Sequence, residues 1–320
     1  MKYTVHPPPE PLRDYVEHLW SIAVDPEEPP ELTLRFFVTF SPCIVFQHHN
    51  GRSAISRRIS AGSGEVSDDN HPTAFVRGAI TRPFQCVAKG FPAAIGVELK
   101  PQALTTLFRI DAAEFTDDIV SLNAFSTENL NEQLLNADTE RDQIALLTQF
   151  LRKRANGSSK GDPLVAEGLR LIHGNRVPIH VRDLLKRLNI SERQFERRFR
   201  RSLGLPARLY LRITRFQEAV RAMKAGHAER LSDIAYELGY TDQAHFIKDT
   251  RALTGFTPKS LSHAIEQSIA TARYRRLLRQ RILIQQDSCE ATGPQLVKRK
   301  ETCGSSRSIP GVARHLSSVT

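Results

Sequence analysis

Two clusters of basic and polar side chains, 51 residues apart, have the spacing needed to contact a polyanion. In the first cluster Arg193, Arg197 and Arg200 recur every three or four residues, which places them on one face of a helix. Phe195 and Phe199 share the same period on a different face, toward a core. The planar guanidinium fork of arginine binds phosphate oxygens and the two acceptors of guanine, so the pattern favours a nucleic-acid surface.

The second cluster repeats this arrangement with other side chains. Gln243, His245 and Lys248 are predicted to be exposed on a helix that buries Phe246. The equivalent pairs, all with the same offset, are Ser191 with Asp242, Phe195 with Phe246, Arg197 with Lys248, and Gly204 with Gly255.

Each cluster follows a short predicted helix and a turn. Before the first, Leu184, Leu185 and Leu188 form one apolar face. Asn189 then tolerates a left-handed turn, and Ser191 with Gln194 three residues later forms a capping box. Before the second, Ile234 and Ala235 begin a short helix, Gly239 turns it, and Thr241 or Asp242 caps the next helix. Two helix-turn-helix units in tandem, each closed by Gly and then Pro, predict two DNA-reading helices.

The segment between the two units reads as one long helix. Pro206 suits its first turn, and Gly226 would end it. Its predicted apolar stripe consists of Leu209, Ile213, Phe216, Val220 and Met223. Such a helix spans ~27–30 Å, which can hold two recognition helices about one turn of DNA apart.

These residues resemble the AraC/XylS family of transcription regulators over Pro163 to Ser262. The resemblance is carried by SERQFERRFRRSLGLPARLYLRITRFQEAVRAM and LSDIAYELGYTDQAHFIKDTRALTGFTPKSL. It implies a seven-helix domain that places recognition helices, at about 192–201 and 242–252, in successive major grooves. The chain departs from the family pattern at Leu185, usually a small residue, at Asn189, often Gly, and at Lys248, often Arg. By position, the predicted DNA-binding residues are Arg193, Glu196, Arg197, Arg200, Gln243, Ala244, His245 and Lys248.

Charge divides the chain in the same place. Residues 1–160 contain 16 basic and 20 acidic side chains, whereas residues 161–262 contain 19 and 11. This distribution predicts that only the second half meets a polyanion. We expect a sensor or dimerisation domain at 1–154, a polar linker at 155–162, the DNA-binding domain at 163–262, and a helical extension with a basic disordered tail at 263–320.

The first half reads as strands followed by helices, so the predicted fold class is α+β. Apolar runs at Leu32 to Phe46 predict strands, and Asn50-Gly51 a turn. The runs in Phe84 to Leu99, split by Gly90-Phe91-Pro92, are typical of a hairpin. Helical spacing follows at Leu104, Leu107 and Phe108, at Leu130, Leu134 and Leu135, and at Ile144, Leu147, Phe150 and Leu151.

PPPEPLRDYVEHLW and GVELKPQALTTLF resemble the N-terminal domain of one branch of the same regulators. That resemblance implies a cupin-like β domain with helices packed on it. Trp20 is predicted to be a core residue. Adjacent His48 and His49 point to opposite faces of a strand, so they predict no metal site.

The resemblance implies double-stranded DNA as the partner and leaves RNA polymerase, a small-molecule effector and a second copy of the chain open. Neither a cofactor nor a membrane segment is expected, and the cytoplasm is the expected compartment. Two other functions are alternatives. A DNA-repair methyltransferase would need a reactive cysteine in a Pro-Cys-His-Arg element, but Cys43 and Cys86 have no adjacent His or Arg, so we expect no enzyme. Non-specific nucleic-acid binding through the basic tail is the other.

Overall fold

The computed structural model of the protein describes residues 2–23, 31–48, 55–60, 66–70, 72–89, 93–125, 129–174, 179–225 and 231–263. All of them lie in the unit Met1–Asp287. Three predictions fall outside the described residues: the turn at Asn50-Gly51, the helix end at Gly226, and the helical extension and disordered tail beyond residue 263. His49 also lies outside them.

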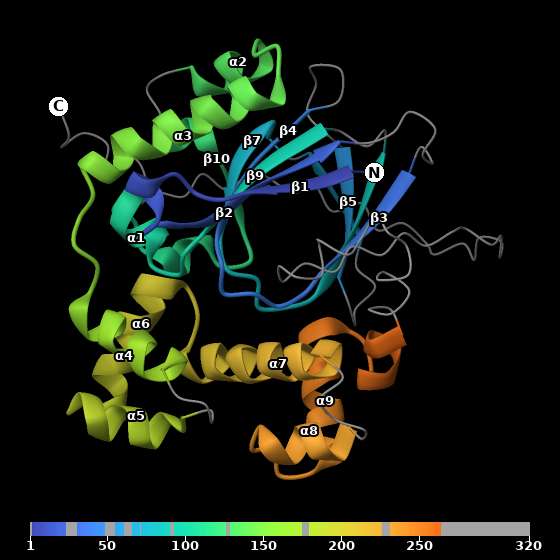
Figure 1. Ribbon diagram of the computed structural model, residues 1–320, viewed down its shortest axis with the longest axis vertical. Coiled ribbons are helices and arrows are strands. Elements are labelled where there is room, and N and C mark those ends of the chain that lie inside the picture. The colour runs from blue at the N-terminus through green and yellow to red at the C-terminus, as the bar shows by residue number, and fades with distance from the viewer. Residues whose placement is uncertain are drawn as a thin grey trace. The chain divides into compact units, whose positions relative to one another are not determined.

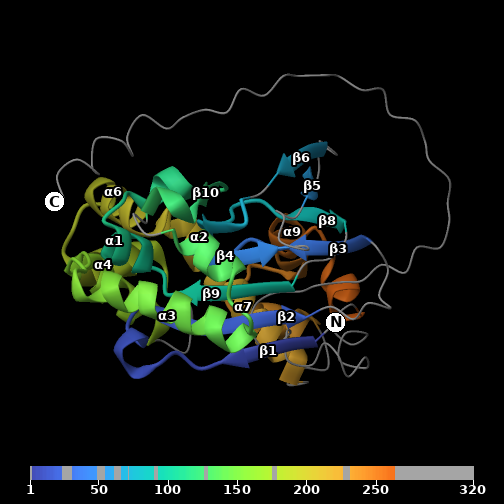
Figure 2. The ribbon, with the colours of Figure 1, turned by 90° about the horizontal axis from the view of Figure 1, so that it is seen from above.

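The first part of the chain folds into two antiparallel sheets (Figures 1 and 2). The larger sheet has the strand order β1 (Lys2–His6), β2 (Val16–Ala23), β9 (Ala93–Leu99), β4 (Cys43–His48), β7 (Ala74–Arg77) and β10 (Ile119–Ser121). The smaller has the order β3 (Glu31–Phe36), β8 (Phe84–Lys89), β5 (Ile55–Ser60) and β6 (Val66–Asn70).

The predicted hairpin within Phe84 to Leu99 is wrong, although both of its strands exist. β8 pairs with β3 and β5 in the smaller sheet, whereas β9 pairs with β2 and β4 in the larger. A local turn signal indicates where one strand ends, but partners distant in sequence decide where the next one pairs. The same change of sheet occurs between β3 and β4, so residues 37–42 also connect the two sheets.

Helices cover one face of the larger sheet (Figure 2). The helices after the strands are α1 (Ala103–Phe108), α2 (Leu130–Leu135) and α3 (Glu140–Asn156), with short 3₁₀ turns η1 (Glu10–Leu12), η2 (Ala112–Phe115) and η3 (Leu122–Phe125). Leu147 and Leu151 of α3 pack in one core with Ile44 and Val97 of the sheet. The predicted helices of this half are therefore confirmed, and α3 continues two residues into the predicted linker.

Trp20 is a core residue, as predicted, with 7% of its surface exposed. In the register of β2 and β9 it stands opposite Gly96, and a methyl group at Gly96 would lie 2.0 Å from the indole ring. The indole ring of Trp20 therefore fits here because residue 96 has no side chain.

The second part is helical. Its described helices are α4 (Pro163–His173), α5 (Val181–Leu188), α6 (Glu192–Leu203), α7 (Ala207–Ala225), α8 (Leu231–Glu237), α9 (Gln243–Thr254) and helical residues 258–263. The chain thus has the predicted α+β class: an antiparallel β domain with packed helices, followed by seven helical segments within the described residues.

Candidate nucleic-acid interface

The first helix-turn-helix unit consists of α5 and α6. Between them Asn189 adopts the left-handed conformation, at φ 49° and ψ 50°, and its N–H donates to the last-turn carbonyls of α5. The side-chain oxygen of Ser191 accepts a hydrogen bond from the Gln194 N–H, which begins α6 as the capping box predicts. Leu185, at a position where the family usually has a small residue, packs half-buried against the core of this unit.

The second unit consists of α8 and α9. Gly239 turns the chain at φ +71°. Of the two candidate caps, Asp242 is the one used: its carboxylate accepts the His245 N–H at 2.7 Å. Thr241 instead contacts the ring Nδ1 of His245 at 3.3 Å. The positive φ explains why a glycine stands at this turn.

The two second helices are equivalent in structure as well as in sequence. α6 and α9 each have 12 residues, begin at a side-chain cap and end at a left-handed glycine, with φ 82° at Gly204 and 79° at Gly255. Phe195 and Phe246 are fully buried at matching positions. The offset of 51 residues therefore relates two copies of one local structure.

The predicted contact residues lie on these two helices, four on each. On α6, Arg193, Arg197 and Arg200 are exposed, and within the described part of the chain none has an ion-pair partner. On α9, Gln243, Ala244, His245 and Lys248 are all exposed. Each helix thus presents an exposed polar face, while Phe195 and Phe199 on α6 and Phe246 on α9 anchor the helices to the core.

Glu196, the eighth predicted residue, has a contact that the sequence did not reveal. It is half-buried, and its carboxylate accepts the backbone N–H of Ala207 at 3.2 Å. Ala207 is the first residue of α7, so Glu196 joins the first recognition helix to the start of the connecting helix. One carboxylate oxygen of Glu196 is therefore occupied by the hydrogen bond from Ala207.

The connecting helix α7 has 19 residues and a length of ~28 Å. Figure 1 shows α4, α5 and α6 gathered at one end of it and α8 and α9 at the other. Ile213 and Phe216 of the predicted stripe are buried, and Leu209, Val220 and Met223 are half-buried. Tyr210, at 0% exposure, was not in the predicted stripe; it packs against segments that only the tertiary fold brings near.

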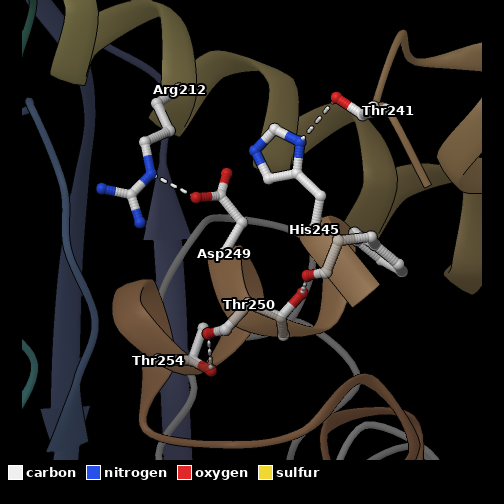
Figure 3. Close-up of polar contacts among 7 residues, drawn as sticks. Arg212, Thr241, His245, Asp249, Thr250 and Thr254 are labelled. Carbon is white, nitrogen blue, oxygen red and sulfur yellow. Dashed lines mark hydrogen bonds and ion pairs between the residues drawn. The ribbon is translucent and has the colours of Figure 1, made fainter. Parts of the chain in front are cut away.

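An ion pair with a buried carboxylate joins α9 to α7 (Figure 3). Asp249 of α9 is 4% exposed and pairs with the Nε of Arg212 of α7. Tyr240 lies beside them with the guanidinium of Arg215 5.2 Å from its ring centroid. Burial, and secondarily the charge of Asp249, raises the pKa of the Tyr240 hydroxyl. Sequence periodicity places Asp249 on α9 but gives no signal for its partner.

Two threonines complete the buried side of α9 (Figure 3). The Thr250 hydroxyl donates to the Phe246 carbonyl at 2.9 Å, and the Thr254 hydroxyl donates to the Thr250 carbonyl at 2.7 Å. Both residues are buried, and these bonds to the preceding turn satisfy their hydroxyls there.

The structure also bears on metal and nucleophile chemistry. Among the described residues, no group of three His, Cys, Asp or Glu side chains is placed to hold a metal ion. Cys43 is buried, and burial together with the charge of Glu98 raises the pKa of its thiol. Cys43 is therefore a small residue of the core. None of the described helices has the length and hydropathy to cross a membrane.

Comparison with known families agrees with the geometry of the two units. Residues 184–264 match a helix-turn-helix domain family (HTH_18), and residues 4–121 match a domain of unknown function (DUF6597). A comparison with curated proteins finds no significant match.

Solved structures that match the chain include ToxT of Vibrio cholerae and the AraC-like transcriptional activator CuxR. A ligand-free, singly substituted ToxT is 12% identical with a TM-score of 0.42, covering 77% of this chain and 97% of its own. ToxT bound to a naphthalenyl-butenoic acid is 10% identical with a TM-score of 0.42. This match covers 82% of this chain and 99% of that ToxT chain. CuxR is 14% identical with a TM-score of 0.24, and the match covers 69% of this chain and 87% of CuxR. These scores are low, so the assignment depends on the domain match and on the two repeated units.

The matched domain belongs to the helix-turn-helix class of DNA-binding modules, and the protein is a DNA-binding transcription regulator. More particularly, its C-terminal helix-turn-helix domain is of the AraC type.

Proposed function

We propose that this regulator reads a specific DNA site by inserting α6 and α9 into successive major grooves. The observation that carries the proposal is the equivalence of the two helices at opposite ends of α7. A helix of ~28 Å between them suits recognition helices about 34 Å apart, the length of one turn of DNA. In this proposal residues 163–262 bind DNA, residues 155–162 form the linker, and residues 1–154 serve a sensing or dimerising role.

The contacts divide between the two helices. On α6 we assign base contacts to Arg193 and Arg197, a cytosine contact to the second oxygen of Glu196, and a phosphate contact to Arg200. On α9 we assign an adenine contact to Gln243, an apolar contact to Ala244, and phosphate contacts to His245 and Lys248. Since α6 contains five arginines and α9 one arginine and one lysine, α6 supplies more of the electrostatic attraction.

Two contacts of the exposed His245 ring support this assignment. It meets the ring of Tyr240 edge to face at a centroid distance of 5.4 Å, and Thr241 contacts its Nδ1. Since Thr241 contacts Nδ1, we assign the DNA contact to the other ring nitrogen, Nε2.

Other parts of the proposal concern partners and class. We propose a cytoplasmic regulator without catalytic activity that acts with RNA polymerase, responds to a small-molecule effector and forms a homodimer. What supports the non-enzymatic assignment is the state of Cys43: a deeply buried thiol with a raised pKa is unsuited to accept an alkyl group from DNA.

The test is a selection of binding sites by the full chain from random duplexes. The proposal predicts a bipartite motif whose two blocks are centred about one helical turn apart. Enrichment of a single short block would contradict insertion of both helices. Binding without any enriched motif would favour the alternative of non-specific binding through the basic tail. Under that alternative, binding would persist after the exposed cations of α6 and α9 are replaced.

A further inference from the structure

A short segment of the β domain contacts the connecting helix α7, joins the core of the first helix-turn-helix unit, and contacts the second unit. The segment runs from Phe37 to Phe40 and follows β3. Phe40 is 1% exposed and stacks on Tyr210 of α7 at a centroid distance of 4.2 Å. Tyr210 in turn meets the ring of Phe199 on α6 at 5.4 Å and hydrogen-bonds His173 of α4 at 2.8 Å. Phe40 is therefore part of the core that holds the first unit.

The same segment reaches the second unit. The Val38 N–H donates to the carbonyl of Leu253 in α9 at 3.0 Å. Phe37 meets Phe256, just after α9, edge to face at a centroid distance of 6.1 Å. Phe37, which contacts the end of the second unit, and Phe40, which packs in the core of the first, are thus only three residues apart.

A second strip of the β domain contacts the end of α6. The Thr105 hydroxyl donates to the Ser202 carbonyl at 3.0 Å, and the Thr116 hydroxyl donates to the Gly204 carbonyl. The approach is close, because a side chain at Gly204 would place its first carbon 2.7 Å from the Ala112 carbonyl oxygen. Ser202 and Leu253 differ by the repeat offset of 51, so the β domain binds both recognition helices at the equivalent carbonyl.

The contacting segments are tied to each other within the β domain. Thr39 and Ile80 exchange two backbone hydrogen bonds, of 3.0 and 2.8 Å. The Asp117 N–H donates to the Ala79 carbonyl at 2.8 Å, and the Asp117 carboxylate accepts the Thr81 N–H at 2.6 Å. The contact to α9 at Val38 and the contact to α6 at Thr116 are therefore joined through a short, hydrogen-bonded path.

From this arrangement we infer that the β domain fixes the distance and angle between α6 and α9, and so determines which spacing between DNA half-sites the protein accepts. Phe37, Val38, Phe40 and Thr105 are the positioning residues. The inference depends on the proposed insertion of both helices. One added base pair moves a half-site by ~3.4 Å and rotates it by ~35°, which a rigid pair of helices cannot follow.

The chain offers a matched control for the key contact. Phe36 is adjacent to Phe37, but its ring stacks on Phe84 inside the β domain at 4.8 Å. Phe37→Ala and Phe36→Ala therefore remove the same atoms from neighbouring positions. Only Phe37→Ala removes the contact to Phe256, just after α9. Thr105→Val is a milder variant that deletes one hydrogen bond while keeping the side-chain shape.

The direct experiment measures the distance between α6 and α9 in the full chain without DNA. Spin labels on a non-natural amino acid at the exposed, equivalent positions Arg201 and Ala252 leave the native cysteines untouched. We expect a broader or shifted distance distribution in Phe37→Ala and in Thr105→Val, and an unchanged one in Phe36→Ala. Unchanged distributions in both test variants would overturn the inference, whatever the protein does on DNA.

The second readout is affinity for the selected site with one base pair added or removed between its blocks. The wild type and Phe36→Ala should lose about tenfold, as for one mismatched base pair, whereas Phe37→Ala and Thr105→Val should lose less than about threefold. Base preferences within each block should stay the same. An unchanged spacing preference in both test variants overturns the inference and leaves the proposed function intact, whereas a wild type with no bipartite site overturns the proposed function.

Discussion

Glu196 on the first recognition helix accepts the backbone N–H of Ala207, the first residue of the helix that leads to the second. This contact satisfies one of the donors that every helix start leaves open. Glu196→Ala should lower the free energy of unfolding by about 1 kcal/mol, the usual value of a lost helix cap. Urea denaturation of the full chain measures it.

Glu192 provides the comparison, since it lies on the same helix and pairs with Arg208 at the surface. Exposed pairs of this kind contribute about 0–1 kcal/mol. We therefore expect Glu192→Ala to have the smaller effect. Equal losses in the two variants would mean that Glu196 does not hold the start of α7.

The pair of Arg212 with Asp249 should contribute more to stability than surface pairs on the same helix. Arg212→Ala leaves the buried carboxylate of Asp249 without its cation. We expect a loss of about 2–3 kcal/mol, below the ~3–5 of a fully buried pair because Arg212 is 40% exposed. Arg208→Ala, which breaks an exposed pair, should cost at most about 1 kcal/mol. A similar cost for both would contradict the role assigned to the pair of Arg212 with Asp249.

Cys43 should be unreactive in the folded protein. Burial, and secondarily the negative charge of Glu98, raises the pKa of its thiol, so almost no thiolate forms near pH 8. Iodoacetamide labelling followed by mass spectrometry should leave Cys43 unmodified until the chain is unfolded. Rapid labelling of native Cys43 at that pH would contradict the core assignment and reopen the alkyl-acceptor alternative.

Lys248 should act as a point charge on phosphate. Lys248→Ala should weaken binding to all sequences to a similar extent and lower the slope of log K against log salt concentration by about one. The paired measurement is Gln243→Ala, which removes no charge and should leave the slope unchanged. Loss of preference at a single base position in Lys248→Ala would instead make it a base-reading residue.

The two helix-turn-helix turns are the features that the sequence predicts best. Asn189 and Gly239 were identified from local chemistry alone, because a left-handed turn restricts the residue type. The capping of α6 by Ser191 follows from a local rule in the same way. Periodicity likewise located Phe195 and Phe246 in the core.

Long-range pairing could not be predicted in this manner. The segment containing β8 and β9 has every local sign of a hairpin, yet its two strands join different sheets. The partner of Asp249 is 37 residues away, and the partner of Phe40 is 170 residues away. Single-sequence periodicity contains no information about such contacts, since it reports only which face of an element is apolar.

The central claim is that α6 and α9 each read one block of a bipartite site. Binding-site selection on wild type, Arg197→Ala and Gln243→Ala tests it most directly, because these residues lie on different helices and have exposed side chains. The account predicts that Arg197→Ala relaxes a guanine position in one block, at a cost of ~1–3 kcal/mol, and that Gln243→Ala relaxes an adenine position in the other. Unchanged base preferences in both variants, with affinity alone reduced, would contradict the claim and assign sequence reading to other residues.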